Sequence, residues 1–175
     1  MTLFAWRFPR PLPGAALVAV LAILPPLAPA SPSGPTPRDA VALAERGAQF
    51  VRANGKDEMV RRINARAPEF NQGELYLAMR DLKGITLAHP TGALIGKNLL
   101  AVPDADGKLF RLEMVAIANG VGKGWVDYKF RNPASGKVEA KSTYVLRVGD
   151  VALEAGIYHL PNQLTTPLTT NLTNR

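Results

Sequence analysis

The sequence predicts an α+β domain in which helices cover at least one face of a single antiparallel sheet of about five strands. Three observations support this fold class. Residues 122–144 have the composition of a hairpin, and helical and strand-like patterns follow one another in blocks along the chain. The 175 residues, 47% of them hydrophobic, suffice for one domain with a real core and are too few for two.

The predicted hairpin at residues 122–144 is the most informative stretch. Its outer segments, residues 122–131 and 138–144, are rich in strand-forming residues, while residues 132–137 read Asn-Pro-Ala-Ser-Gly-Lys. This arrangement predicts two antiparallel strands joined by a loop longer than the minimal one. The strands carry a tryptophan, two tyrosines and a lysine, a combination suited to binding a small, flat, negatively charged molecule.

The first 30 residues have the pattern of a secretory signal peptide. Arg7 and Arg10 precede an apolar run at residues 15–24, acidic residues are absent, and small residues end the segment at Ala30. A membrane-spanning helix needs about 20 apolar residues, and Pro25 interrupts this run. We therefore expect cleavage near Ala30 and a periplasmic or secreted protein, with an uncleaved anchor as the alternative.

Charge and cysteine content limit the expected partners. Loss of Arg7 and Arg10 lowers the formal net charge from +7 to +5, a basic balance that favours anionic ligands. Arg61, Arg62 and Arg66 lie close together but without interleaved aromatic residues, so we interpret them as a solvated helix face and expect no nucleic-acid partner. The chain has no cysteine, which excludes disulfides and thiol chemistry.

Three helices are predicted from apolar residues with a period near 3.6 and from capping residues. Thr36 and Pro37 are favourable residues for the start of the first helix, and Gly55 is a favourable residue after its end. The predicted helices are residues 37–54, a shorter segment from about residue 57 to residue 67, and residues 109–119.

Strands are predicted where apolar and β-branched residues follow turn residues. The predicted strands are residues 75–80, 85–89, 122–131, 138–148 and 151–159. Residues 31–37 are rich in proline and serine and are predicted to be a linker. Leucine recurs every fourth residue among threonines near the C-terminus, and proline and threonine there oppose a helix, so we expect residues 161–175 to be a flexible polar tail. The domain then spans residues 38–160.

Ordered matches along the chain resemble the single Cache domain family, type 2, a PAS-like extracytoplasmic sensor domain of bacterial chemoreceptors and sensor kinases. The matching segments are Glu74–Tyr76 with Asp81 and Gly84, Ala88–Pro90, Leu94–Leu99, Asp104–Gly107 with Phe110, Gly122–Tyr128, Asn132–Pro133, Lys141–Val145 and Ala155–Tyr158.

The resemblance covers about residues 39–158. It implies a long N-terminal helix, a five-stranded antiparallel sheet and a pocket for short organic acids between the sheet and its covering loops and helix. Receptors of this family continue into a membrane helix and a signalling module, where this sequence continues into the polar tail. A separate membrane receptor or histidine kinase is therefore the expected signalling partner.

Several residues are candidates for ligand binding. If Lys141 faces a pocket from its strand, its buried ammonium needs an anion, which a ligand carboxylate would supply. The alternative is that Lys141 points to solvent, as most lysines do. Trp125 and Tyr128 lie three apart and should face opposite sides of the sheet, and we favour Trp125 for the pocket. Met114 would join it at the apolar end.

Three further candidates supply polar groups. Tyr76 and Tyr144 can donate hydroxyl hydrogen bonds, or be core residues. His89 can contact the ligand, or only anchor a loop.

Metal, cofactor and catalytic motifs are not found. Two isolated histidines do not make a metal site. Asp104 and Asp106 precede a glycine as in a calcium loop, but Val102 stands where the first aspartate belongs. The glycines after residue 119 follow a helix, the reverse of a phosphate-binding loop. We therefore expect no cofactor and no enzyme.

Two functional hypotheses follow. The first is an extracytoplasmic binding domain for a short organic acid. The second is a ligand-independent interaction subunit that binds a membrane receptor or kinase, or forms a homodimer through its N-terminal helix.

Overall fold

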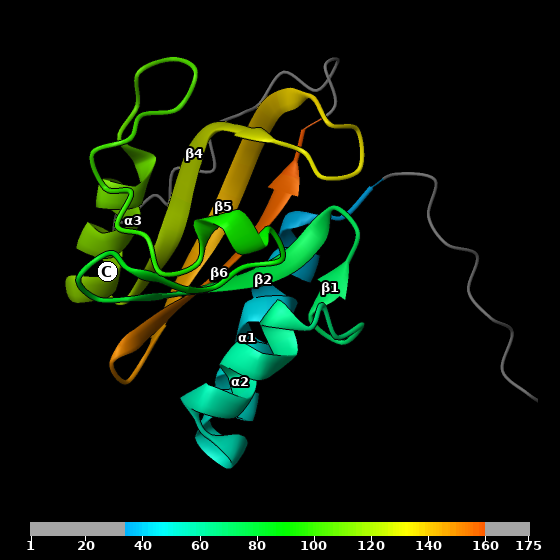
Figure 1. Ribbon diagram of the computed structural model, residues 1–175, viewed down its shortest axis with the longest axis vertical. Helices are drawn as coiled ribbons and strands as arrows, with labels where there is room; N and C mark the ends of the chain where they lie inside the picture. The colour runs from blue at the N-terminus through cyan, green and yellow to red at the C-terminus, as the bar shows by residue number, and fades with distance from the viewer. Residues whose placement is uncertain (1–33, 160–175) are drawn as a thin grey trace, which may run out of the picture. The chain divides into compact units, whose positions relative to one another are not determined.

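The computed structural model describes residues 34–159 (Figure 1). The predicted signal peptide, residues 31–33 of the predicted linker and the predicted tail lie outside these residues. Within them, no helix is both long enough and apolar enough to cross a membrane. The elements in chain order are α1 (Pro37–Asn54), α2 (Lys56–Asn64), β1 (Asn71–Gln72), β2 (Leu75–Asp81), β3 (Thr86–Ala88), the 3-10 helix η1 (Gly92–Leu94), α3 (Phe110–Asn119), β4 (Lys123–Arg131), β5 (Val138–Val148) and β6 (Val151–Tyr158).

Helix α1 has the predicted bounds because both ends carry local stop signals. The Thr36 side chain accepts a hydrogen bond from the Asp39 N–H, and the Asp39 carboxylate accepts one from the Thr36 N–H, which completes a capping box. Helix α2 ends at Asn64, three residues before the predicted end. Its last turn closes there because Arg66 adopts a left-handed backbone conformation with φ of 55°.

The sheet is antiparallel with strand order β1-β2-β6-β5-β4, and β3 pairs with β2. The two-residue strand β1 was not predicted; the five longer strands were. Strand β6 enters between β2 and β5, so it joins the first hairpin to the central hairpin. Figure 1 shows β6 beside both β5 and β2.

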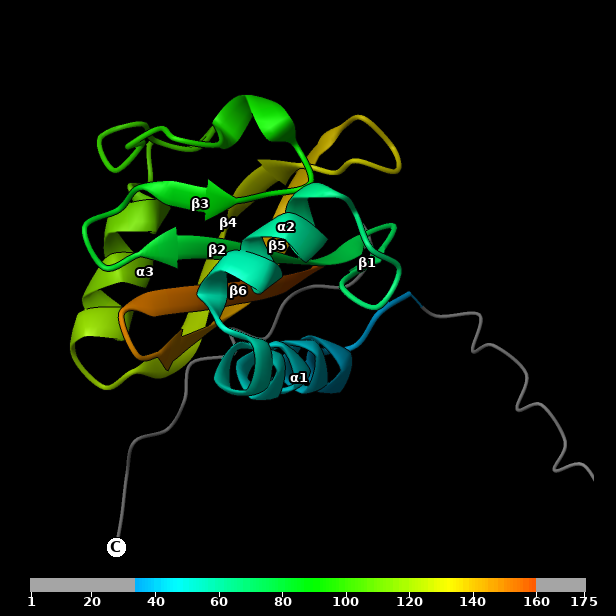
Figure 2. The ribbon, with the colours of Figure 1, turned by 60° about the horizontal axis from the view of Figure 1, so that its bottom comes forward.

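Side chains alternate across the sheet and form a core on each face. On one face Leu77 and Leu153 pack against α1, which lies below the sheet in Figure 2. Gly47 permits this close approach, because a Cβ there would lie 2.6 Å from Leu77 Cδ2. On the opposite face Met114 of α3 packs on Val126 and other small apolar residues.

The face of α1 that points away from the sheet is polar. Glu45, Arg46, Gln49 and Arg52 are exposed, whereas Leu43 on the sheet-facing side of the helix is buried in the core. Homodimerisation through this helix stays a prediction.

Candidate functional site

A small cavity lies on the α3 face of the sheet, where side chains from five strands, α3 and the segment after β3 converge. Its volume is about 20 Å³, which is room for about one water molecule. The lining side chains combine aromatic rings with charged groups. They are Tyr76, Ala78 and Arg80 of β2, Thr86 of β3, His89, Leu94 of η1, Phe110 and Arg111 of α3, Tyr128 and Phe130 of β4, Lys141 and Thr143 of β5, and Glu154 of β6.

Lys141 places a buried amine at this cavity. The residue is 3% exposed, and its Nζ donates hydrogen bonds to Tyr76 Oη at 2.7 Å and Tyr158 Oη at 3.3 Å. The amine also lies 4.0 Å from the centre of the Tyr76 ring. Burial lowers the pKa of Lys141 to about 7, and Glu154 only partly opposes this effect. The predicted orientation of Lys141 into a pocket is confirmed; whether it binds a ligand stays a prediction.

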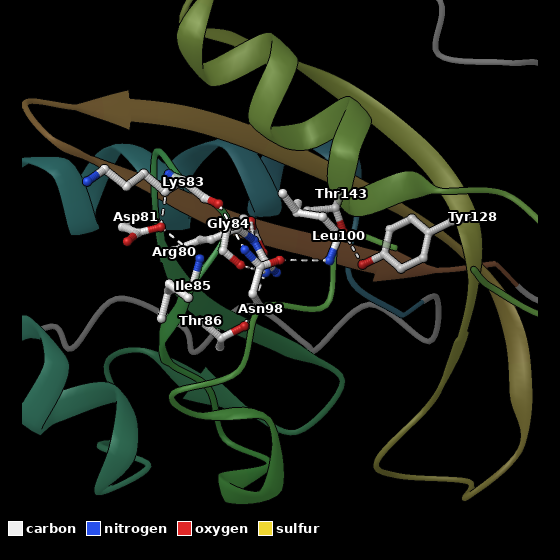
Figure 3. Close-up of polar contacts among 11 residues, drawn as sticks. Arg80, Asp81, Lys83, Gly84, Ile85, Thr86, Asn98, Leu100, Tyr128 and Thr143 are labelled. Carbon is white, nitrogen blue, oxygen red and sulfur yellow. Dashed lines mark hydrogen bonds and ion pairs between the residues drawn. The ribbon is translucent and has the colours of Figure 1, made fainter. Parts of the chain in front are cut away.

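Glu154 is already paired with a different cation. Arg80 Nε lies 2.8 Å from Glu154 Oε1, and Arg80 Nη2 lies 3.2 Å from Oε2, with both side chains buried. Arg80 Nη1 donates to Thr86 Oγ1 and to the Gly84 carbonyl (Figure 3). Burial lowers the pKa of Arg80, but attraction to Glu154 outweighs it and raises the pKa. Glu154 is therefore not available as a close partner for Lys141.

Arg111 is a second cation without a carboxylate partner. Its guanidinium carbon stands 4.1 Å from the Phe110 ring centre, and its Nη1 donates to the Val102 carbonyl. Burial lowers the pKa of Arg111. Among residues 34–159, neither Arg111 nor Lys141 forms an ion pair. The cavity thus has three cationic residues against one carboxylate.

His89 is buried at the cavity with a defined hydrogen-bond role. Its Nδ1 accepts the Thr91 N–H at 2.9 Å, so the neutral ring carries its proton on Nε2. Burial, Lys141 and two arginines lower the pKa of His89 to about 3. The ring is therefore neutral at pH 7 and holds one N–H that a ligand oxygen can accept.

Tyr128 lies in the cavity wall, and Trp125 does not. The Tyr128 ring stacks on Phe110 with centroids 3.9 Å apart, and its hydroxyl bonds to Thr143 Oγ1 at 2.9 Å (Figure 3). Trp125 packs against Tyr144 in the core under α1. The expectation that the two face opposite sides is confirmed. The preference for Trp125 as the cavity residue is wrong, because alternation does not reveal which face carries the cavity.

Two other candidates lie outside the cavity wall. Tyr144 belongs to the core under α1, on the face opposite Lys141. Met114 is fully buried in the α3 core near the cavity, but it does not line it. Tyr76, His89, Tyr128 and Lys141 are the predicted residues that the fold brings together.

Sequence reasoning missed Arg80, Arg111 and Glu154, along with the wall residues Phe110 and Thr143. One signal was available for Glu154 and Arg80. Glu154 is the only charged residue of β6, and Arg80 is the only one of β2 before its last residue, Asp81; a charge at a buried strand position needs a partner. No comparable signal marks Arg111, which lies in a helix whose exposed face also carries polar residues.

A serine, a histidine and an aspartate meet elsewhere, at the end of β6. Ser142 Oγ contacts the Asp127 carboxylate and lies 2.6 Å from His159 Nε2. His159 is half-buried. The hydroxyl has one proton, which the carboxylate accepts, so His159 Nε2 donates to Ser142 and does not activate it. This order differs from a catalytic triad, in which the histidine lies between serine and acid.

Two larger hollows adjoin the cavity. One of about 270 Å³ includes Lys141 and Tyr128 in its lining, and one of about 320 Å³ includes Tyr76. The residues that enclose the cavity therefore also border wider spaces. Among the residues described, no cluster of three or more histidine, aspartate or glutamate side chains has the arrangement of a metal site.

Comparisons with known proteins agree with this geometry. The family model described as Single Cache domain 2 matches residues 40–152. A search of curated proteins finds no match.

Three solved structures share the fold. A methyl-accepting chemotaxis protein of Vibrio parahaemolyticus aligns with TM-score 0.59 and 20% identity over 69% of this chain and 86% of its own. The periplasmic sensor domain of a chemotaxis protein aligns with TM-score 0.54 and 27% identity over 69% of this chain and 88% of its own. A Cache chemosensory domain, described for carboxylic acid recognition, aligns with TM-score 0.55 and 22% identity over 69% and 86%.

Proposed function

Because this chain belongs to the single Cache domain 2 family, we propose that it is an extracytoplasmic sensor domain whose cavity binds a short organic carboxylate. Domains of this family are ligand-binding sensors and not enzymes, and the solved neighbours are sensor domains of chemotaxis proteins. The structural neighbour described for carboxylic acid recognition supports the ligand class.

The observation that carries the proposal is the pair of buried cationic groups without anions. Lys141 and Arg111 border the same cavity, and neither has an ion-pair partner in the described part of the chain. A buried cation is costly without an opposite charge, and a ligand carboxylate supplies it with charge-assisted hydrogen bonds. The Tyr76 hydroxyl and the His89 N–H add neutral donors to the same space.

The size of the cavity restricts the ligand. A volume of about 20 Å³ is too small for an organic acid, so binding requires the Lys141–Tyr76 contact to open. The neighbouring hollows provide space into which these side chains can move. Acids of two to four carbons, such as acetate, propionate, lactate and pyruvate, fit this requirement best.

Calorimetric titration of the mature chain with these four acids at pH 6.5 tests the proposal. Lys141→Met keeps an unbranched chain that matches the four-carbon stem of the lysine, and removes the amine. Loss of one hydrogen bond between charged groups corresponds to about 1.5–3 kcal/mol, or about a 10- to 150-fold weaker affinity. Arg111→Met should weaken binding in the same direction.

The exposed Lys123 on β4 is the matched control. Lys123→Met removes an equal charge from the same hairpin and should leave the affinity unchanged. Absence of binding by all four acids, or equal affinity of Lys141→Met and the unaltered protein, would refute a carboxylate site at this cavity.

The proposal extends to location and partner. A signal peptide at residues 1–30 places the domain outside the cytoplasm, and N-terminal sequencing of the mature protein from the periplasmic fraction should begin near residue 31. The neighbours belong to chemotaxis proteins, which supports a membrane receptor or histidine kinase as the protein that responds to the ligand-bound domain. Crosslinking in intact envelopes should then detect such a receptor or kinase only when the acid is added, and not with Lys141→Met.

A further inference from the structure

Gly156 occupies an interior position of β6, the strand between β2 and β5. Glycine inside a strand weakens it and often marks a close approach of another group. Its backbone is not left-handed, unlike that of the turn glycines of this domain. Conformational freedom therefore does not account for a glycine here.

The space above Gly156 is already filled by other residues. A Cβ at this position would overlap Thr143 Oγ1 and would lie 2.7 Å from Lys141 Cε and 2.9 Å from the Ser142 carbonyl oxygen. The backbone oxygen cannot rotate away. Any side chain at residue 156 must therefore displace both Thr143 Oγ1 and Lys141 Cε, or shift β5 relative to β6.

The path of Lys141 explains why this space matters. Lys141 leaves β5 opposite Tyr158, and its amine reaches the Tyr76 hydroxyl on β2, on the far side of β6. Adjacent strands lie about 4.8 Å apart, so this contact bridges roughly 10 Å of sheet. The lysine side chain passes over β6 on its way to Tyr76, and Gly156 is the residue beneath its Cε.

We propose that Gly156 is a positioning residue of the cavity: its missing side chain lets Lys141 cross β6 and present its amine beside Tyr76 and Tyr158. The role in ligand binding rests on the proposed carboxylate site. The position of the amine is a separate property that is measurable without any ligand.

Gly156→Ala tests the proposal, with Gly92→Ala as the matched control. Gly92 lies in η1 near the cavity, has no left-handed backbone, and would place a Cβ with nothing within 4 Å. The readout is the NMR signal of the Lys141 ε-methylene group, assigned through its loss in Lys141→Met. The amine lies near the Tyr76 and Tyr158 rings, so this signal should be shifted upfield by ring currents.

In Gly156→Ala the upfield shift should disappear, and the amine should titrate at higher pH, closer to ordinary lysines. Gly92→Ala should keep both properties. Acid binding by Gly156→Ala should weaken as much as in Lys141→Met. If the proposed ligand class is wrong, no acid binds either protein, but the NMR change still appears. A folded Gly156→Ala protein with an unchanged Lys141 signal overturns the inference.

A second comparison covers the case in which Gly156→Ala folds poorly. In a Lys141→Ala background the contact with Cε is gone, so adding Gly156→Ala should lower the denaturation midpoint less than it does in the unaltered protein. Equal losses in the two backgrounds, including loss of folding in both, would show that Gly156 makes room for Thr143 and the β5 backbone and not for Lys141.

Discussion

Lys141 Nζ donates a hydrogen bond to Tyr76 Oη at 2.7 Å, and this contact joins two strands, β5 and β2, that are separated by β6. The Tyr158 hydroxyl extends the contact, because it lies 3.3 Å from the Tyr76 hydroxyl and donates to the Arg131 carbonyl at the end of β4. Burial raises the pKa of both tyrosines, so both remain neutral hydroxyls. A ligand that binds the Lys141 amine in place of the tyrosine hydroxyls therefore changes hydrogen bonds on three strands, β2, β5 and β6.

The affinity for a carboxylate should depend on pH through Lys141. The amine of the empty site has a pKa of about 7, and a bound carboxylate raises it because opposite charge favours the ammonium. Binding above pH 7 therefore requires proton uptake, and the dissociation constant should rise up to about tenfold per pH unit. Between pH 5.5 and 6.5 it should be nearly constant.

Calorimetry in two buffers that differ in ionisation enthalpy measures this proton uptake directly. At pH 8 the difference in observed heat between the buffers should correspond to the uptake of close to one proton per ligand bound. At pH 6 the uptake should be much smaller. An affinity that is the same at pH 6 and pH 8.5 would contradict a role for the amine in binding.

Lys141 should also make stability rise with pH. Its pKa is about 7 in the folded protein and about 10.4 in an unfolded chain. Between these values the unfolded state binds more protons, so the free energy of unfolding increases with pH, by at most about 1.4 kcal/mol per unit. Below pH 7 both states are protonated and this contribution is constant.

Urea denaturation at pH 6, 7.5 and 9 checks this slope. The unaltered protein should gain stability relative to Lys141→Met between pH 7.5 and 9, and Lys123→Met should follow the unaltered protein. Parallel pH profiles for all three proteins would show that the amine titrates normally.

His89 should stay neutral in mild acid. Its pKa is about 3 in the fold and about 6.5 in an unfolded chain. As the pH falls below 6.5, the unfolded state takes up a proton that the folded state does not, so the protein loses up to about 1.4 kcal/mol per pH unit. Below about pH 3 this loss is complete.

His89→Gln keeps an acceptor for the Thr91 N–H and removes the titrating group. Its loss of stability between pH 6.5 and 4.5 should be smaller than that of the unaltered protein. An NMR titration that protonates the folded His89 ring near pH 6 would contradict its burial beside cations.

Removal of the Glu154 side chain should lower the free energy of unfolding far more than removal of an exposed carboxylate. Glu154→Ala leaves the buried Arg80 guanidinium without its partner, and breaking one side of a buried pair destabilises by about 3–5 kcal/mol. Replacing both residues, as in Arg80→Met with Glu154→Leu, should recover most of the lost stability, because no uncompensated charge remains.

Asp150→Ala is the control, because it breaks the exposed pair with Lys56. Its effect on the denaturation midpoint should be much smaller. Equal effects of Glu154→Ala and Asp150→Ala would mean that the Arg80–Glu154 pair is solvated in solution.

Local rules accounted for most of the secondary structure. The capping residues at Thr36 and Pro37 correctly predicted the start of α1, and the turn between residues 131 and 138 correctly predicted the β4–β5 hairpin. These features depend on residues a few positions apart, so their signals lie within one stretch of sequence. Helix α2 was predicted too long because no local signal marks a left-handed Arg66.

The candidate site was predicted only in part, because strand alternation does not reveal which face of the sheet carries the cavity. It separates Tyr128 from Trp125 and Lys141 from Tyr144, but it does not say which member of each pair faces α1. The sequence by itself determined the elements, their antiparallel pairing within hairpins and the aromatic and cationic character of the central hairpin. Only the tertiary structure inserted β6 between β2 and β5. This places Arg80 against Glu154, 74 positions apart, and Lys141 against Tyr76, 65 positions apart. Contacts over such distances depend on how both faces of the sheet are buried, and that is a property of the whole packed domain.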